Sequence, residues 1–511
     1  MLVRGSESLG KDRGMLKGLM QLMMLIAILG SSAHAGEPLL QVSRVDTGRA
    51  LTQSLLHGSF VGPDQMEIVV VDVPRRGQSR QARIYPIRQQ RIASQASVAF
   101  QLDHQVAALD IASSDNGDLL AALTPKGVFV INPADGTMHN LLSVMTMVRG
   151  ADERQVLLQD FLRDLNNDGR SDLLVQGFSS VQVAIQRPGG SFGPVSHLPV
   201  SPIMNVSSEH TISYRSPRIY VKDVDDDGQL EMMVWMRDHF LLFRQQASGV
   251  FTLPPQRIEP GIRISFDDVE EMSMGITEED QTEFSGRLLH DLTDYDGDGV
   301  VDLVTMVVKS LGVFKKQTRY EFYRGHVDGE TLRFDRVPAT EVASDGIQFA
   351  MLETDIDRDG ASDIMVSSVE IGIGKILRAL LTGSVNFDLG FYRQQGGFFE
   401  SRPDIVREVT VTFDFGSGDA LYPFTLVTDI VGDAQPDLLV QEGEGQLNVF
   451  LGRQDDRLFE RKPIEMEMVM PDEPEQVQLT DLNGDGRNDL LMHLDKNGQR
   501  SVQVLLTSAG P

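Results

Sequence analysis

The sequence predicts an all-β protein, a β-propeller of about eight four-stranded blades, and three observations lead to this fold. An acidic residue followed at once by a short apolar run recurs eight times along the 511 residues. A second strand-like segment follows most of these runs, as expected for antiparallel sheets. The last repeat is one strand short, whereas a spare extended stretch precedes the first repeat. Four-stranded sheets repeated in this way can close into a ring.

The apolar runs are rich in Val, Leu, Ile and Met and are bounded by turn residues, which indicates buried strands. They begin at Glu67, Asp118, Asp172, Glu231, Asp302, Asp363, Asp437 and Asp489. Strand-like segments follow at 127–131, 181–185, 240–243, 320–323, 447–451 and 502–506. A further strand precedes each acidic loop, as at 477–479. One unit of about 60 residues therefore supplies three or four strands.

Closure of the ring can also be predicted. The stretch 39–44 precedes the first unit, and we expect it to supply the missing outer strand of the last blade. Seven blades remain the alternative count, if one of the two weak N-terminal copies is irregular. Two long intervals between repeats predict blade insertions near 237–285 and 367–425.

The start of the chain has the pattern of a secretory signal peptide. Basic residues from Lys11 to Lys17 precede an apolar run at 19–29, and an Ala-x-Ala motif ends at Ala35. This run is short for a membrane-spanning helix, although an uncleaved anchor is the alternative. We therefore expect a signal peptide at 1–35 and a mature propeller at 36–511 without a transmembrane span. The chain has no cysteine, which fits a bacterial periplasmic or extracellular protein.

The excess of acidic residues limits the kinds of partner that the chain can bind. The chain holds 74 acidic against 46 basic residues, a formal net charge of −28. Nucleic acids and anionic membrane surfaces require clustered cations, so neither is an expected partner. Thiolate metal sites and cysteine nucleophiles are excluded because cysteine is absent.

Acidic residues cluster in nine-residue loops directly before the buried runs. Their pattern is Asp-x-(Asp/Asn)-x-Asp-Gly-x-x-(Asp/Glu), and we number its residues as positions 1 to 9. The five full copies place candidate ligands at positions 1, 3, 5 and 9, namely Asp164, Asn166, Asp168 and Asp172; Asp223, Asp225, Asp227 and Glu231; Asp294, Asp296, Asp298 and Asp302; Asp355, Asp357, Asp359 and Asp363; and Asp481, Asn483, Asp485 and Asp489.

This spacing suits calcium, a hard cation that takes six to eight oxygen ligands at flexible angles. Side chains at positions 1, 3 and 5 converge when the loop curls, and glycine at position 6 allows the positive φ of a sharp turn. Magnesium fits less well because it requires tighter octahedral geometry. An EF-hand is excluded because position 12 lies inside a strand instead of offering glutamate. The sequence therefore predicts five calcium ions.

The other three copies depart from the pattern. The loop 429–437 keeps aspartate at positions 1, 5 and 9 but has Val431 at position 3 and Ala434 at position 6, so a sixth ion there is doubtful. The loop 110–118 keeps only positions 1 and 9, and the loop 59–67 keeps only its last acid. No ion is expected in these two.

The loops and their following strands resemble FG-GAP/VCBS repeats, the calcium-loop blades of the integrin α N-terminal propeller and of many bacterial exported proteins. This resemblance implies structural calcium and a module that binds an extracellular or periplasmic protein or glycan. The alternative is an exported polysaccharide hydrolase or lyase built on the same propeller. No nucleophile elbow, zinc-protease motif or phosphate loop occurs in the sequence, so we expect no enzyme activity.

Arginine ends the second-strand segment in several repeats, at Arg187, Arg244, Arg324, Arg393 and Arg453. The structural interpretation is an ion pair with an acid of a neighbouring blade. The functional interpretation is a ring of cations that faces an anionic ligand.

Overall fold

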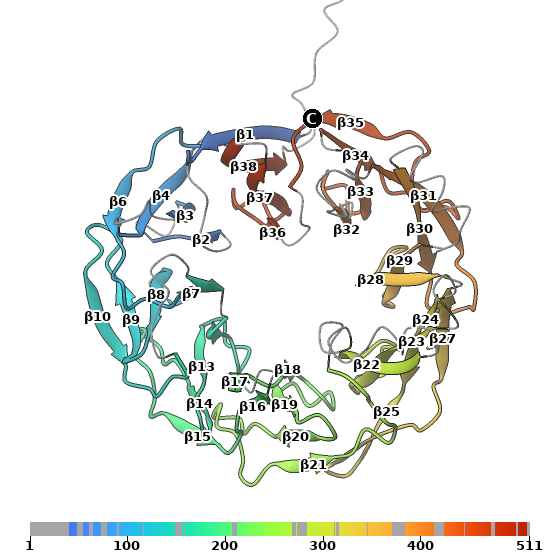
Figure 1. Ribbon diagram of the computed structural model, residues 1–511, viewed down its shortest axis with the longest axis horizontal. Coiled ribbons are helices and arrows are strands. Elements are labelled where there is room, and N and C mark those ends of the chain that lie inside the picture. Colours follow the sequence, from blue (N-terminus) through green and yellow to red (C-terminus); the bar gives the residue numbers. More distant parts are fainter. Residues whose placement is uncertain are drawn as a thin grey trace, which may run out of the picture.

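A computed structural model of the chain shows a closed ring of eight blades, which confirms the predicted β-propeller and decides the count (Figure 1). The predicted signal peptide lies outside the described residues. The structure describes residues 40–48, 55–60, 65–72, 79–88, 91–115, 117–148, 156–158, 160–206, 212–267, 272, 284–310, 312, 316–344, 346–369, 384–412, 424–443, 445–471, 476–496 and 499–507.

Each blade is an antiparallel meander whose first strand lies toward the centre of the ring and whose fourth strand lies outside (Figure 1). Blade one contains β2 (Leu56–Gly58), β3 (Glu67–Asp72) and β4 (Gln81–Arg88), with β5 (Arg91–Ile92) and β6 (Val98–Gln101) both paired to β4. Blade two contains β7 (Ala108–Ala112), β8 (Leu119–Thr124), β9 (Gly127–Ile131) and β10 (Met138–Leu142), with β11 (Leu157–Leu158) parallel to β7.

The next four blades follow the same order. Blade three contains β12 (Leu162–Arg163), β13 (Asp172–Gln176), β14 (Val181–Ala184) and β15 (Ser196–Leu198). Blade four contains β18 (Ile219–Lys222), β19 (Glu231–Trp235), β20 (Phe240–Phe243) and β21 (Gln256–Ile258). Blade five contains β22 (Phe284–Thr293), β23 (Asp302–Ser310), β24 (Lys316–Tyr323) and β27 (Thr340–Ser344). Blade six contains β28 (Ile347–Thr354), β29 (Asp363–Val369), β30 (Ser384–Tyr392) and β31 (Ile405–Thr412).

The last two blades complete the ring. Blade seven contains β32 (Thr425–Thr428), β33 (Asp437–Gln441), β34 (Gln446–Phe450) and β35 (Ile464–Glu467). Blade eight contains β36 (Val477–Thr480), β37 (Asp489–Lys496), β38 (Gln499–Thr507) and β1 (Leu40–Asp46). Strand β1 pairs antiparallel with β38, from Leu40 opposite Thr507 to Asp46 opposite Ser501. The predicted closure by an N-terminal strand is therefore confirmed.

Two hairpins are added to this frame, β16 (Ile203–Val206) with β17 (Ile212–Arg215), and β25 (Gly325–Asp328) with β26 (Thr331–Phe334). The ranges expected to be insertions, 237–285 and 367–425, contain β20, β21, β30 and β31, which are ordinary third and fourth strands of their blades. Residues 268–271, 273–283, 370–383 and 413–423 of these ranges lie outside the described residues.

Apolar contact between neighbouring blades forms the core. Every residue of β3, β19 and β33 is buried, as predicted for the runs that follow the acids. One apolar cluster joins blades four and five through Trp235, Leu289 and Tyr323, and another joins blades eight and one through Leu491 and Ile68. In the described part of the chain, no helix is long and apolar enough to cross a membrane.

Trp235, the one tryptophan of the chain, has an exposed fraction of 0%. Its indole Nε1–H donates to the carboxylate of Asp267 at 2.6 Å, and Asp267 is itself buried. Arg215 also pairs with this carboxylate, and Arg237 Nε lies 3.6 Å from it. The tryptophan is thus a core residue, and its indole N–H is hydrogen-bonded to a buried acid.

Candidate metal centres

Six acidic loops lie between the first and second strands of blades three to eight, and all six have the same backbone curl. The carboxylate at position 1 accepts the backbone N–H of position 5 at 3.1–3.3 Å and that of position 6 at 2.7–3.1 Å. The carboxylate at position 5 accepts the N–H of position 7 at 2.8–3.0 Å. The loops are therefore folded around their own aspartates.

The residue at position 6 has a positive φ in all six loops, as the turn requires. Five of these residues are glycine, with Gly169 at 81° and Gly299 at 86°. Ala434 adopts 69° in the loop 429–437, so this loop keeps the curl although alanine is strained there. The departure at Ala434 does not abolish the loop shape.

The acid at position 9 has a structural role that the sequence pattern did not predict. It is buried at the start of the second strand, and one oxygen accepts the N–H of position 2 at 2.9–3.2 Å. In blades three, five, six and seven, the other oxygen accepts an N–H just after the third strand at 2.7–2.8 Å, from Gln186, Gly325, Gln394 and Gly452. The acid thus fastens the loop to two strands.

Burial raises the pKa of these position-9 acids because the charged form loses its hydration. The pKa reaches about 8 for Asp302 and about 7 for Glu231. It reaches about 6 for Asp172, Asp363 and Asp437. The nearby loop aspartates raise the pKa further, whereas the backbone N–H donors lower it.

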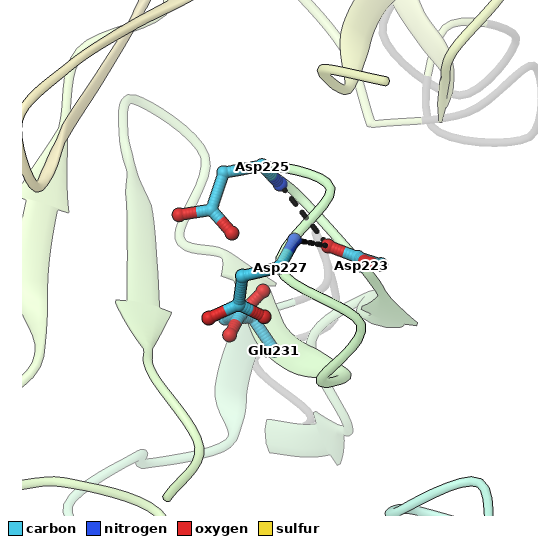
Figure 2. Close-up of side chains that lie close together, drawn as sticks. All are labelled: Asp223, Asp225, Asp227 and Glu231. Carbon is cyan, nitrogen blue, oxygen red and sulfur yellow. Dashed lines mark hydrogen bonds between the residues drawn. The ribbon is translucent and has the colours of Figure 1, made fainter.

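Three of the predicted sites gather carboxylates, with one oxygen from each residue lying within 4.8 Å of the others. Figure 2 shows the set of blade four, where the N–H groups of Asp225 and Asp227 point at Asp223. The sets are Asp223, Asp225, Asp227 and Glu231; Asp294, Asp296 and Asp302; and Asp355, Asp357 and Asp359. The predicted ligands Asp298 and Asp363 are not members of these sets.

The loops with asparagine at position 3 differ. Among the described residues, neither 164–172 nor 481–489 forms a set of three acids of this kind. Asn166 Nδ2 donates to Asp168 at 3.1 Å, and Asn483 Nδ2 donates to Asp485 at 3.2 Å. The asparagines therefore hold the position-5 carboxylates toward position 3.

Position 3 carries the clearest sign of a missing ligand. In four loops its Oδ1 atom is buried and has no hydrogen-bond partner, in Asn166, Asp225, Asp296 and Asp357. A buried polar atom without a partner costs about 1–3 kcal/mol, so its repetition at one loop position calls for an explanation. A hard divalent cation among these oxygens would remove that cost.

The arginines at the ends of the third strands fall into two groups. Arg244, Arg324 and Arg393 pair with the position-3 aspartate of their own blade. The predicted ion pair with a neighbouring blade is therefore wrong for Arg244 and Arg324, whereas Arg393 also lies 3.9 Å from Asp456 of blade seven. Their engagement also speaks against a ring of cations that faces an anionic ligand. Arg187 and Arg453 lie two residues further along their segments, and Arg453 pairs with Asp455 at 2.7 Å and with Glu460.

The fold and the repeated loops define a β-propeller with acidic loops on six consecutive blades. Residues 164–234 match the model of the FG-GAP-like repeat family, and this range covers the loop of blade three and reaches the second strand of blade four. This part of the chain is therefore similar to an FG-GAP-like repeat, within a β-propeller of eight blades. The more specific likeness to the integrin α propeller stays a prediction.

No curated protein sequence matches the chain significantly. Among solved structures, an Agrocybe aegerita lectin that recognises non-reducing terminal N-acetylglucosamine is 14% identical, with 91% of this chain and 97% of that chain covered and a TM-score of 0.41. The Dos1 propeller is 8% identical (92% and 97% covered, TM-score 0.41), and the V. cholerae biofilm matrix protein Bap1 is 11% identical (92% and 91%, TM-score 0.36). These values are low, so the fold assignment rests on the strand pairing of this chain.

The metal-free protein should lose stability as the pH rises from about 6.5 to 8.5. A raised pKa in the folded state gives stability that is complete below the unfolded pKa of about 4 and is lost as the pH passes the folded pKa. Asp302 and Glu231 dominate this window and together account for about 2 kcal/mol. Below about 6.5 the half-buried His57, His290 and His493, whose pKa is lowered by partial burial, act in the opposite direction.

The measurement is urea unfolding in calcium-free buffer at several pH values. Asp302→Asn is the matched control, because it removes the group with the highest pKa and should flatten the profile. Stability that stays constant or increases across this window would contradict the assignment.

Proposed function

We propose that this protein is an exported, calcium-binding β-propeller that acts as a binding module for a protein or a glycan, with calcium in a structural role. The observation that carries the calcium assignment is the unpartnered, buried Oδ1 atom at position 3 of four loops. Each of these atoms lies in a loop with three further acids at fixed positions. Calcium would supply the positive charge and the oxygen-binding capacity that these groups lack.

The donor set favours calcium over other metals. Every candidate ligand is a carboxylate or amide oxygen, and histidine and cysteine contribute none, which disfavours zinc. The loops of blades three, four, five, six and eight would hold the ions through positions 1, 3, 5 and 9. In blade seven Val431 offers no side-chain oxygen and packs against an apolar cluster, so a sixth ion is not proposed.

The hairpin between blades three and four supports the binding role. Met204, Ile212 and Tyr214 on this hairpin have exposed fractions of 54%, 55% and 49%. The ring of Phe178 from the β13–β14 turn contacts Tyr214 edge-on, with a centroid separation of 5.6 Å. Large apolar side chains gathered at an exposed site are typical of protein and sugar recognition.

The cavities favour a binding module over a hydrolase. A cavity of about 430 Å³ at blade five is lined by Ser285, Lys309, Gln317 and Arg319, among others. Among the described residues, no carboxylate lines this cavity, whereas glycoside hydrolysis requires a pair of them.

The test uses the chain 36–511 after calcium removal and reloading, with bound ions counted by native mass spectrometry. We expect about five ions per chain, and binding to a glycan array or to extracellular proteins that weakens in chelator. Tyr214→Ser should reduce binding without changing the ion count, and Tyr85→Phe in the core serves as a control. An ion-free protein would refute the calcium assignment. Binding unaffected by Tyr214→Ser would place the binding surface elsewhere.

A further inference from the structure

The six loops differ from one another in a correlated way. In each of their blades the register of the second and third strands, continued by one pair, places one residue opposite the position-9 acid, directly after the third strand or, in blade eight, near its end. From blade three to blade eight these residues are Ile185, Arg244, Arg324, Arg393, Leu451 and Leu506, and the position-3 residues are Asn166, Asp225, Asp296, Asp357, Val431 and Asn483. Arginine faces every loop with aspartate at position 3, and an apolar residue faces every loop without it.

In all three blades the arginine contacts the same oxygen atom of the position-3 aspartate. Arg244 Nη1 lies 2.6 Å from Asp225 Oδ2, and Arg324 Nε lies 2.8 Å from Asp296 Oδ2. Arg393 Nη1 lies 3.7 Å from Asp357 Oδ2 and also pairs with Asp404. The arginine always contacts Oδ2, while the buried Oδ1 of the same aspartate has no hydrogen-bond partner. The guanidinium thus holds one oxygen and leaves the other for the loop.

The pairing also equalises charge. At positions 1, 3, 5 and 9, loops with aspartate at position 3 carry four carboxylates, and the facing arginine leaves three net negative charges; the loop 223–231 has a fifth carboxylate, Asp226, at position 4. Loops with Asn166, Val431 or Asn483 carry three carboxylates and no facing cation. Counted over positions 1, 3, 5 and 9 and the facing residue, the six loops therefore have the same formal charge; in blade three Arg170 of the loop also pairs with Asp168. Without the arginine, the fourth carboxylate would be unpaired among like charges, which disfavours its ionised form.

All three arginines also reach the following blade, and Arg393 does so through Asp456 of blade seven at 3.9 Å. Arg244 Nη2 donates to the carbonyl of Glu330 at 3.0 Å, in the β25–β26 turn of blade five. Arg324 Nη2 donates to the carbonyl of Gly397 in blade six at 3.2 Å. A Cβ at Gly397 would lie 2.2 Å from this Nη2, and Gly397 has a φ of 82°, which favours glycine. These arginines therefore connect the position-3 aspartate of one blade to the neighbouring blade.

We propose that Arg244, Arg324 and Arg393 are positioning residues of the metal loops in blades four to six. Each directs Oδ1 of the position-3 aspartate into the loop and balances the fourth carboxylate when no ion is bound. This inference rests on the proposed calcium binding. It predicts that calcium and arginine share the same aspartate, so the arginine matters most when calcium is absent.

The experiment compares Arg324→Leu, Asp296→Asn and the double variant in the chain 36–511, melted in chelator and in saturating calcium. We expect Arg324→Leu to lower the melting temperature more in chelator, so that the calcium-induced rise exceeds that of the unchanged protein by about 3 °C. The double variant reproduces the residue pair of blade eight, Asn483 with Leu506. In chelator it should regain most of the melting temperature that Arg324→Leu loses. Arg453 does not face a position-3 aspartate, so Arg453→Leu should lower the melting temperature by the same amount in chelator and in calcium.

The inference would be overturned if Arg324→Leu lowered the melting temperature equally in chelator and calcium and the double variant regained none of it. Arg324 would then have only a packing role. That result is distinct from failure of the proposed function. If the unchanged protein melts at the same temperature in chelator and calcium, calcium binding itself is refuted, and the positioning role falls with it.

Discussion

Saturating calcium is expected to raise the melting temperature of the chain 36–511 by many degrees over chelator. Each loop holds at least three carboxylates that repel one another until a cation lies between them. A ligand that binds only the folded state stabilises it by about 2.7 kcal/mol per site at one hundred times its dissociation constant. Differential scanning calorimetry in the two conditions measures the shift, and coincident melting curves would contradict it.

A pair of loop variants shows whether this stabilisation arises in the loops. Asp298→Ala removes a carboxylate from a loop that holds four acids and the turn glycine, and it should cost much of the calcium-induced rise. Asp433→Ala alters the corresponding position of the loop with Val431 and the strained Ala434, and it should cost little. Equal losses would mean that the buried position-9 acids, such as Asp302 and Asp437, determine calcium binding in place of the loop side chains.

Deletion of β1 should have an effect of similar size, because it opens the ring. A chain beginning at Thr47 loses seven paired residues along β38 and the buried side chains of Leu40 and Val45. Each of these side chains contributes about 2 kcal/mol. The long strand β38 would then become an exposed edge that can pair with other chains. We expect a lower melting temperature and aggregation, measured by calorimetry and light scattering.

The matched control is a chain that begins at Leu40 and keeps the whole strand. It should melt like the chain 36–511. A synthetic peptide of residues 36–48, added to the chain that begins at Thr47, should restore part of the lost stability by refilling the strand position. If the shortened chain stays monomeric and equally stable, the pairing of β1 with β38 does not hold the ring closed.

The sequence predicted the ring because its signals are local and repeated. The acid before each apolar run, the turn glycine and the spare strand near Leu40 all lie within a few residues of what they determine. The insertions were bounded less well, since the spacing between acids cannot distinguish added loops from long strands such as β22 and β30.

The sequence alone could not show which of the arginines pair with a position-3 aspartate. Arg187 and Arg453 lie only two residues beyond the strand position that faces a loop, and this offset becomes visible once the strands are paired. The sequence also did not reveal that the position-9 acids accept backbone hydrogen bonds and fasten the loop to two strands. Their backbone donors, such as Gly325 and Gly452, lie across the blade and carry no side-chain signal.

The single tryptophan has a practical consequence for spectroscopy. Trp235 lies four residues after Glu231 and is buried against blade five, with its indole nitrogen bound to Asp267. Its fluorescence therefore reports on one sector of the ring, whereas far-ultraviolet circular dichroism averages over all eight blades. If the two signals change together during unfolding, the blades lose structure as one cooperative unit. If the fluorescence changes first when calcium is withdrawn, the sector around blade four opens before the rest of the ring.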